Sequence, residues 1–418
     1  MRFIADLHIH SRFSRATSSD MDIPAIARAA KQKGIQLVAT GDFTHPEYFE
    51  SLKQHLRDGG NGLYLHDNVH FIINTEVNNI YSWNGRLRRV HNLIYVPSLE
   101  SAARVSEMLA SYGKLDADGR PSVSISCHDM VARILELEPR AFVVPAHIWT
   151  PWFSLYGSNS GFDSFADCFG DLADEVFAVE TGLSSDPPMN WRLSELDKKT
   201  LISNSDAHSP SRLGREANVF DCDLSYDTIR EVLKTRDKNR LLFTIEFFPE
   251  EGKYHYDGHR NCGIRLAPGE STLSGDVCPV CGRKLTIGVL HRVEQLADRK
   301  PEEVPKDMIP FKHLVPLEEI IAEALEQGRD TAGVAKKYEE LINALGPEFE
   351  ILMNVPVEEI ARFGEKIAEG IDRMRRGEIT VEPGFDGVFG TVQVLPGTRR
   401  VTFEPERGEK GQQLRLFG

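Results

Sequence analysis

Asp6-Leu7-His8-Ile9-His10 is the stretch that decides the fold, because it puts three polar side chains at the end of an apolar first strand. Successive side chains of a strand point to opposite faces, so Asp6, His8 and His10 share one face. Two imidazoles beside a carboxylate can hold one metal ion between them. Two polar residues on a solvated strand face would show the same spacing, so the interpretation depends on partners elsewhere in the chain.

Apolar, β-branched runs alternate with segments of helical periodicity over residues 1–245. The alternation predicts an α/β barrel of about seven βα units rather than two small domains. We expect strands at 2–8, 35–40, 70–75, 91–96, 141–146, 176–180 and 200–204, and helices at 23–33, 98–112 and 225–236.

Side chains of the kind that bind metals stand at the ends of most of these strands. The carboxyl ends of parallel strands meet at one mouth of a barrel, so we expect these side chains to converge. His91 stands instead at the start of its strand, which leaves the direction or boundary of that strand open. The pattern predicts a polynuclear metal centre built from His8, His10, Asp42, Glu76, His91, His147, Asp206 and His208.

The composition describes a soluble globular protein that is too long for one core. Its 418 residues predict two or three domains, and its net charge of −14 does not indicate nucleic-acid binding. Any DNA contact would have to be local and aided by bound cations, and composition alone favours a small-molecule enzyme. Because it has no run of 18 apolar residues and no signal-peptide pattern, we expect a cytoplasmic protein without a membrane segment.

Two knuckle-like pairs follow the predicted barrel. His259-x-x-Cys262 and Cys278-x-x-Cys281 are separated by 15 residues, which is typical of a closed tetrahedral zinc site. His255 is an alternative first ligand, although the spacing favours His259. Four protein ligands leave no open position, so this zinc is predicted to be structural, within a module over residues 246–295.

The rest of the chain reads as a small, mainly helical domain over residues 296–403 with a flexible tail over 404–418. Helical periodicity predicts helices at 317–327, 331–345 and 356–376, and turn residues precede an expected strand pair at 388–394 and 400–403. The basic residues that end the last helix, Arg373, Arg375 and Arg376, are interpreted as a solvated run that satisfies the helix dipole, with contact to phosphate as the alternative.

The successive motifs of residues 1–245 resemble those of the PHP (polymerase and histidinol phosphatase) superfamily. They are Asp-Leu-His8-Ile-His10-Ser, Thr40-Gly-Asp42, Glu76, His91, His147 and Asp206-Ala-His208. The resemblance implies a distorted seven-stranded barrel that hydrolyses phosphoesters with two or three metals. It implies one ion held by His8, His10, Glu76 and Asp206, and a second held by Glu76, His91 and His147. Arg15 stands where the family often has a third-site ligand, which leaves that site to Asp42 and His208, with His45 a weaker helper.

The order of the modules narrows the resemblance. A PHP barrel, a His/Cys knuckle, His291-Arg-Val-Glu-Gln-Leu-Ala-Asp-Arg and Glu382-Pro-Gly-Phe-Asp-Gly-Val-Phe-Gly together resemble the endonuclease Q family over essentially the whole chain. The resemblance implies a DNA repair enzyme that nicks the strand 5′ to hypoxanthine, uracil, xanthine or an abasic site by attack of a metal-activated water. His8, His10, Glu76 and Asp206 would be catalytic, with zinc, manganese, iron or magnesium as the ions.

Basic and aromatic residues near the predicted mouth are candidates for contact with DNA. Arg86, Arg88 and Arg89 are suited to phosphates, and Trp83, Trp149 and Trp152 to stacking on or replacing a base, although ordinary loop packing would also account for the tryptophans. The tail sequence Gln413-Leu414-Arg415-Leu416-Phe417 resembles the peptide that binds the bacterial sliding clamp. The alternative is an apolar tail that docks on its own protein.

Two other functions share parts of this pattern. A PHP phosphatase acting on a small phosphomonoester would use the same metals and would explain the acidity, but it would not explain the zinc knuckle, the helical domain or the tail. A non-catalytic scaffold that binds DNA or a clamp is disfavoured, because the predicted metal ligands are nearly complete.

Overall fold

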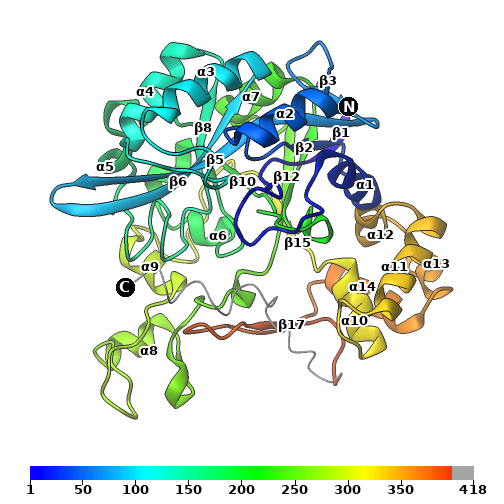
Figure 1. Cartoon of the computed structure of the whole chain (residues 1–418). Coiled ribbons are helices and arrows are strands. Elements are labelled where there is room, and N and C mark those ends of the chain that lie inside the picture. Colours follow the sequence, from blue (N-terminus) through cyan, green and yellow to red (C-terminus); the bar gives the residue numbers. More distant parts are fainter. Residues whose placement is uncertain (398–418) are drawn as a thin grey trace.

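A computed structural model describes residues 1–397, which form an α/β body, a group of helices and a small module that carries the two predicted His/Cys pairs and is called the zinc-knuckle module after that prediction (Figure 1). The main sheet of the body runs in the order β15-β12-β11-β1-β2-β5-β4-β3, and β6 joins β5 to β8. Its strands are β1 (Arg2–Asp6), β2 (Leu37–Ala39), β3 (Arg57–Asp58), β4 (Tyr64–His66), β5 (Val69–Trp83), β6 (Arg86–Val96), β7 (Ser122–Val123), β8 (Phe142–Pro145), β11 (Ala217–Asp221), β12 (Leu241–Glu246) and β15 (Phe311–His313). The predicted α/β class is confirmed.

The sheet is mixed, which corrects the expectation that its strands are parallel throughout. β1 pairs in parallel with β2, and β2 with β5, but β11 is antiparallel to β1, and β6 is antiparallel to both β5 and β8. Within the described residues, β9 (Ala178–Glu180) and β10 (Thr200–Ile202) pair with each other and with no third strand. Among the described residues, the strand pairing therefore does not trace a complete ring.

The β5–β6 hairpin is much longer than the two predicted strands. Its register runs from Ile73 opposite Val96 to Trp83 opposite Arg86, and its tip extends away from the body (Figure 1). Asn84 and Gly85 form the turn with positive φ values of 49° and 74°, as two-residue hairpin turns require. The strand predicted to begin at His91 begins at Arg86, so His91 lies in mid-strand. The charged residues Arg86, Arg88 and Arg89 interrupt the apolar pattern there and hid this extension.

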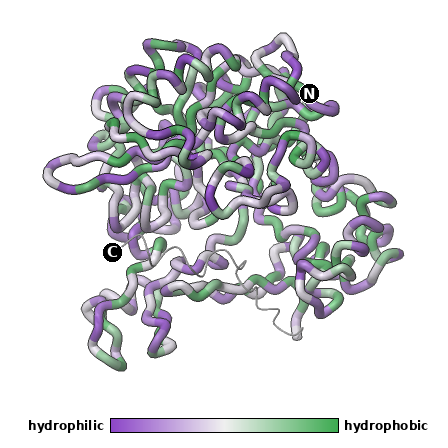
Figure 2. The backbone as a smooth tube through the Cα atoms, in the orientation of Figure 1, coloured by the Kyte–Doolittle hydropathy of each residue, from purple (hydrophilic) through white to green (hydrophobic). Residues whose placement is uncertain are grey.

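Three of the helices that cover the body, at 23–33, 99–110 and 226–235, lie where periodicity predicts them, and the others are findings of the structure. The side chain of Asp22 caps α1 by accepting a hydrogen bond from the Ala25 N–H, and Gly34 ends the helix at a φ of 83°. The helices of the body are α1 (Ile23–Lys33), α2 (Pro46–His55), α3 (Leu99–Ala110), α4 (Cys127–Leu137), α5 (Phe165–Phe169), α6 (Pro187–Asn190) and α7 (Tyr226–Thr235). Figure 2 shows hydrophobic stretches through the interior of the body and hydrophilic turns around its edge.

The zinc-knuckle module follows β12. It contains β13 (Asp257–His259), β14 (Ile264–Leu266), α8 (Pro268–Leu273) and α9 (Val289–Leu296). The chain then returns to the body, where β15 pairs in parallel with β12 at the edge of the main sheet. Pro-rich spacing around residues 301–316 predicts only a link, so this short edge strand is a finding of the structure.

The last helices are α10 (Leu317–Leu325), α11 (Ala332–Leu345), α12 (Glu348–Met353), α13 (Val357–Ala361) and α14 (Glu365–Arg375). The single helix expected over 356–376 is two helices, because the chain breaks at Gly364. Arg375 donates to the carbonyl oxygens of Leu352, Ile351 and Val355, so this part of the basic run closes the end of α12. No described helix is long and apolar enough to cross a membrane.

A final hairpin, β16 (Thr380–Glu382) and β17 (Thr391–Gln393), connects the helices with the zinc-knuckle module (Figure 1). At one end, the N–H groups of Val394 and Leu395 donate to Glu323 of α10. At the other end, Asp386 accepts hydrogen bonds from the Arg260 N–H and the Thr286 hydroxyl. The partner of the expected strand at 388–394 is therefore β16, and the second predicted strand, 400–403, lies outside the described residues.

Candidate metal centre

The carboxylate of Glu76 lies between two pairs of histidines. Its Oε2 is 3.0 Å from Nε2 of His10 and 3.6 Å from Nε2 of His8. Its Oε1 is 2.6 Å from Nδ1 of His91 and 3.1 Å from Nε2 of His147. Glu76 is buried in the middle of β5, and His91 faces it because β6 is antiparallel. One acid can thus contribute a ligand atom to each of two neighbouring ions.

Asp206 completes the first of these groups. Its Oδ1 lies 3.2 Å from Nε2 of His10 and 3.6 Å from Nε2 of His8. Among the described residues, none of these three atoms has a partner with the geometry of a hydrogen bond. Buried polar atoms are nearly always paired, and three that face one point without pairing fit a divalent cation.

His208 lies with His10 and Asp206 in a further group whose ligand atoms are mutually close. The His10 and His208 rings are 4.6 Å apart, and the His208 side chain is 28% exposed, compared with 26% for Asp206. The centre is therefore open to solvent on the side of these two residues, while His8, His10 and Glu76 form its buried floor.

Asp42 lies behind His10 rather than beside the other ligands. Its Oδ1 is 3.0 Å from Nδ1 of His10, and its Oδ2 accepts hydrogen bonds from Ser11 and Ser14. The preceding Gly41 allows this approach, since its φ is 68° and a Cβ there would lie 2.5 Å from the Ile9 carbonyl oxygen. The described groups of possible metal ligands do not include Asp42. It can orient the His10 ring so that Nε2 faces Glu76.

Neither Arg15 nor His45 reaches the centre. Arg15 forms an ion pair with Asp118 and its side chain is 65% exposed. The His45 ring stacks on Phe13 with 4.3 Å between centroids. The described residues therefore offer only the group of His10, Asp206 and His208 for a third ion.

Two residues that strand-end patterns did not single out also belong to the centre. Glu180, the last residue of β9, accepts hydrogen bonds from the His147 N–H at 2.8 Å and lies 3.0 Å from Nδ1 of His8. Arg120, which lies in a loop, donates a hydrogen bond of 3.2 Å to Oε2 of Glu76. The run at 176–180 ends in this acid, so Glu180 was detectable as a further strand-end carboxylate. Arg120 has no pattern that could have identified it.

Backbone strain and charge mark the same place. Asp42, His147 and Asp206 have positive φ values of 47°, 32° and 48°, which residues other than glycine seldom adopt and which concentrate at functional sites. Burial opposes ionisation of Glu76, but the facing His91 and the Arg120 guanidinium outweigh it and hold the pKa of Glu76 well below its usual value. Glu76 is therefore held as an anion in the floor of the centre, the state in which a carboxylate binds a cation.

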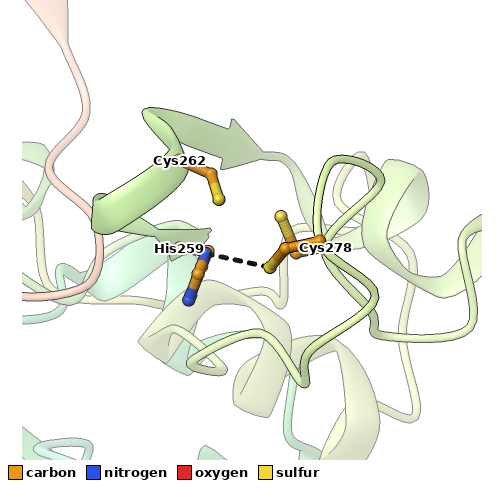
Figure 3. A group of neighbouring side chains, drawn as sticks. His259, Cys262 and Cys278 are labelled. Carbon is orange, nitrogen blue, oxygen red and sulfur yellow. Dashed lines mark hydrogen bonds between the residues drawn. The ribbon is translucent and has the colours of Figure 1, made fainter.

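A separate cluster of four side chains forms in the zinc-knuckle module. The ligand atoms of His259, Cys262, Cys278 and Cys281 lie within 4.8 Å of one another, and Sγ of Cys281 is 3.7 Å from Nδ1 of His259. Figure 3 shows His259, Cys262 and Cys278 converging from two separate segments. His255 is not in the group; its ring is buried and stacks on Tyr256. Sulfur and imidazole in this number are the ligand set of a structural zinc site.

The chain was compared with solved structures. The lesion-specific endonuclease Q of Pyrococcus furiosus is 33% identical with a TM-score of 0.85, and the match covers 94% of this chain and 95% of that one. The chain belongs to the endonuclease Q family. A second endonuclease Q structure, a complex with a 27-mer duplex that carries an abasic lesion at the active site, is 32% identical with a TM-score of 0.84 over 95% of this chain and 97% of that one.

Relatives of this endonuclease Q family member also match by sequence. Residues 316–378, which contain α10 to α14, match the MJ0043 C-terminal domain. The uncharacterized protein MJ0043 of Methanocaldococcus jannaschii is 37% identical over 253 residues, 59% of this chain, and the match spans 31% of the length of that protein. The uncharacterized protein YqxK of Bacillus subtilis is 26% identical over 94% of this chain and 99% of its own length.

The tryptophans predicted to contact DNA differ in exposure in this endonuclease Q family member. Trp149 is buried, donates to Asn190 and packs on Tyr156, so it belongs to the core and cannot stack on a base in this conformation. Trp83 is half-buried against Phe162, and Trp152 is half-buried against Tyr254.

The three arginines of β6 also differ. Arg88 lies over the rings of Trp83 and Phe162 and donates to the Gly161 carbonyl oxygen, so its guanidinium already has internal partners. Arg89 lies over the ring of Phe153. Arg86 is exposed beside the hairpin turn. Of the three, Arg86 has the geometry best suited to meet a phosphate.

Proposed function

We propose that this endonuclease Q family member is a metal-dependent DNA endonuclease that nicks one strand 5′ to deaminated bases (hypoxanthine, uracil and xanthine) and to abasic sites. The observation that carries the proposal is the Glu76 carboxylate, which faces His8 and His10 with one oxygen and His91 and His147 with the other. Family membership supports the same reading, because a relative with the same fold holds a duplex with an abasic lesion at its active site.

The proposed ligand sets share Glu76. His8, His10, Glu76 and Asp206 would hold one divalent ion, Glu76, His91 and His147 a second, and His10, Asp206 and His208 a third. Zinc, manganese, iron and magnesium all accept such nitrogen and oxygen donors, the first three more readily. Ions bound there would neutralise charge on a phosphodiester and activate a water for attack.

The chain's own residues have distinct parts in this proposal. Asp206 and His208 face solvent at the rim, where a phosphodiester would enter. Arg120 adds a fixed positive charge next to Glu76 and can stabilise negative charge that develops on the phosphate. Asp42 and Glu180 hold the rings of His10 and His8 from behind.

We assign the metallohydrolase to residues 1–245, the zinc-binding module to 246–295 and a DNA-binding domain to 296–403. The tail over 404–418 is proposed to reach a bacterial sliding clamp through Gln413, Leu414, Leu416 and Phe417, which lie outside the described residues. The proposed working place is the cytoplasm, at the nucleoid, because that is where the proposed substrate lies.

The test is a nicking assay with the full chain and one metal at a time. Labelled duplexes carry one deoxyinosine, one deoxyuridine, one deoxyxanthosine, one abasic site or no lesion. The expected product is a single nick 5′ to the lesion, lost in Asp206→Ala and kept in Asp171→Ala, which alters an acid whose side chain is 89% exposed. Release of phosphate from small esters with the DNA intact would replace the proposal with a phosphatase. DNA binding without any cleavage would replace it with a scaffold.

A further inference from the structure

Aromatic residues connect the metal centre with the zinc-knuckle module through pairwise contacts and the adjacent positions 152 and 153. The Phe153 ring lies 5.2 Å from that of His91, and the neighbouring Trp152 meets Tyr254 edge to face at 5.5 Å. The Lys253 ammonium lies 6.0 Å from the Tyr254 ring and 5.5 Å from the Phe389 ring. We call Phe153, Trp152, Tyr254, Lys253 and Phe389 the aromatic track.

The inner end of the track is held in a strained conformation. Phe153 has a φ of 62°, which is rare for an aromatic residue and costs about 1 kcal/mol or more. Two hydrogen bonds keep it there: its N–H donates to the Ser160 hydroxyl, and its carbonyl oxygen accepts from the His91 N–H at 2.9 Å. This strained backbone therefore holds the half-buried Phe153 ring next to His91, a proposed metal ligand.

The outer end of the track is exposed on a well-anchored turn. Phe389 is 43% exposed and Val388 41%, although Phe385 in the same turn packs onto Gly258. Asp386 fixes the turn through its hydrogen bonds to Arg260 and Thr286. Every other phenylalanine, tyrosine and tryptophan in residues 1–397 is buried or partly buried. The turn held by Asp386 therefore keeps the Phe389 ring exposed to solvent, which favours an external partner for this ring.

We propose that the aromatic track is a stacking surface for unpaired nucleotides of the DNA strand beside the scissile phosphate. Every base has a face that can stack on an aromatic ring, and such contacts are worth about 1–3 kcal/mol each, whatever the sequence. In a paired duplex these faces are covered, so the partner is unpaired DNA. Lys253 and Arg89 place positive charge along the rings of a chain whose net charge is −14, which suits a phosphate backbone there. The proposal deepens the proposed function and rests on it.

The test measures binding of a labelled single strand and of a fully paired duplex of the same sequence by fluorescence anisotropy, with the full-length protein. Phe389→Ala and Tyr254→Ala are expected to bind the single strand about 5- to 150-fold more weakly, as 1–3 kcal/mol implies, and the duplex within twofold of wild type. Phe389→Trp is expected to keep wild-type affinity. Leu273→Ala, which removes a 91% exposed apolar side chain of the same module, is the matched control. A melting curve of each variant confirms that it is folded.

Two results would overturn the aromatic track. One is wild-type affinity for the single strand in both alanine variants. The other is an equal loss on single strand and duplex, which would indicate a contact that does not read base faces. Because these are binding measurements, they remain interpretable if the wild-type protein fails to nick a lesion. A failure to nick would refute the proposed function, whereas the binding measurements would still show whether the aromatic track stacks on unpaired bases.

Discussion

Oε1 of Glu180 lies 3.0 Å from Nδ1 of His8, and its other carboxylate oxygen accepts the His147 N–H at 2.8 Å. One buried acid from β9 therefore holds a histidine of each of the two main ligand groups. Asn204 donates to the same carboxylate at 2.8 Å and keeps it in place. Carboxylates in this position fix the orientation and basicity of a ligating imidazole.

Glu180→Gln is expected to weaken divalent metal binding by about 10- to 100-fold, since a neutral amide no longer raises the basicity of His8. Calorimetric titration of the metal-stripped protein with Mn²⁺ measures this loss directly. Glu195→Gln is the matched control, because Glu195 also accepts two hydrogen bonds but from Tyr156 and Phe165, away from the centre. Equal affinities in the two variants would show that Glu180 does not position the ligands.

Cys281→Ser is expected to remove about one zinc ion per chain and to lower the melting temperature, because a zinc site contributes directly to folding. Elemental analysis of the purified protein gives the zinc content, and a thermal melt gives the stability. Cys222→Ser changes a cysteine outside the cluster and should keep the full zinc content. An unchanged melt and zinc content in Cys281→Ser would refute the structural zinc site.

Lys33→Met is expected to lower the free energy of unfolding by about 3–5 kcal/mol, because it leaves the buried Glu348 carboxylate without a charged partner, with hydrogen bonds only from the Leu317 N–H and the Tyr338 hydroxyl. Nζ of Lys33 in α1 lies 2.6 Å from Glu348 in α12, and both side chains are only 5% exposed. Urea denaturation measures the loss. Lys31→Met, which breaks an exposed pair with Asp67, should cost about 0–1 kcal/mol. Equal losses in the two variants would show that the buried pair does not join the helices to the body.

Glu246 is expected to contribute a loss in the free energy of unfolding as the pH rises from about 5 to about 7. Burial raises the pKa of Glu246 from 4.5 to about 7, against the hydrogen bonds from Ser203 and Thr244. In this window the Glu246 carboxyl group binds a proton more tightly in the folded protein than in the unfolded chain, so raising the pH removes about 3 kcal/mol of stability through this group. Below pH 4.5 the contribution is fully present.

Urea titrations at several pH values in Glu246→Gln check this prediction. The stability of the variant relative to wild type should rise by about 3 kcal/mol across this window. The variant should keep some slope, because burial next to Glu246 raises the pKa of Glu216 as well. Glu231→Gln, which alters an exposed partner of Arg240, should follow the wild-type curve. A difference in stability between Glu246→Gln and wild type that does not change with pH in this range would contradict the prediction.

Local patterns in the sequence determined most of the secondary structure and the identity of the ligand candidates. Helix α1 lies where periodicity predicts it, and Asp22 and Gly34 cap its two ends, because caps and amphipathic faces are properties of neighbouring residues. The pairs of His259 with Cys262 and of Cys278 with Cys281 were detectable for the same reason, since each knuckle is a local turn. His8, His10, Glu76 and Asp206 stood out because strand ends are marked by a change from apolar to polar residues.

Only the tertiary structure decided the roles that depend on strand direction and burial. The antiparallel course of β6 brings His91 to Glu76 from mid-strand, which no short-range pattern encodes. Packing against Tyr156 buries Trp149, while Trp152, three residues later, stays half-exposed. The contact of Glu180 with His8 joins residues 172 positions apart. Residue type and spacing reveal which chemistry is available, whereas contacts between distant segments decide which side chains share a site.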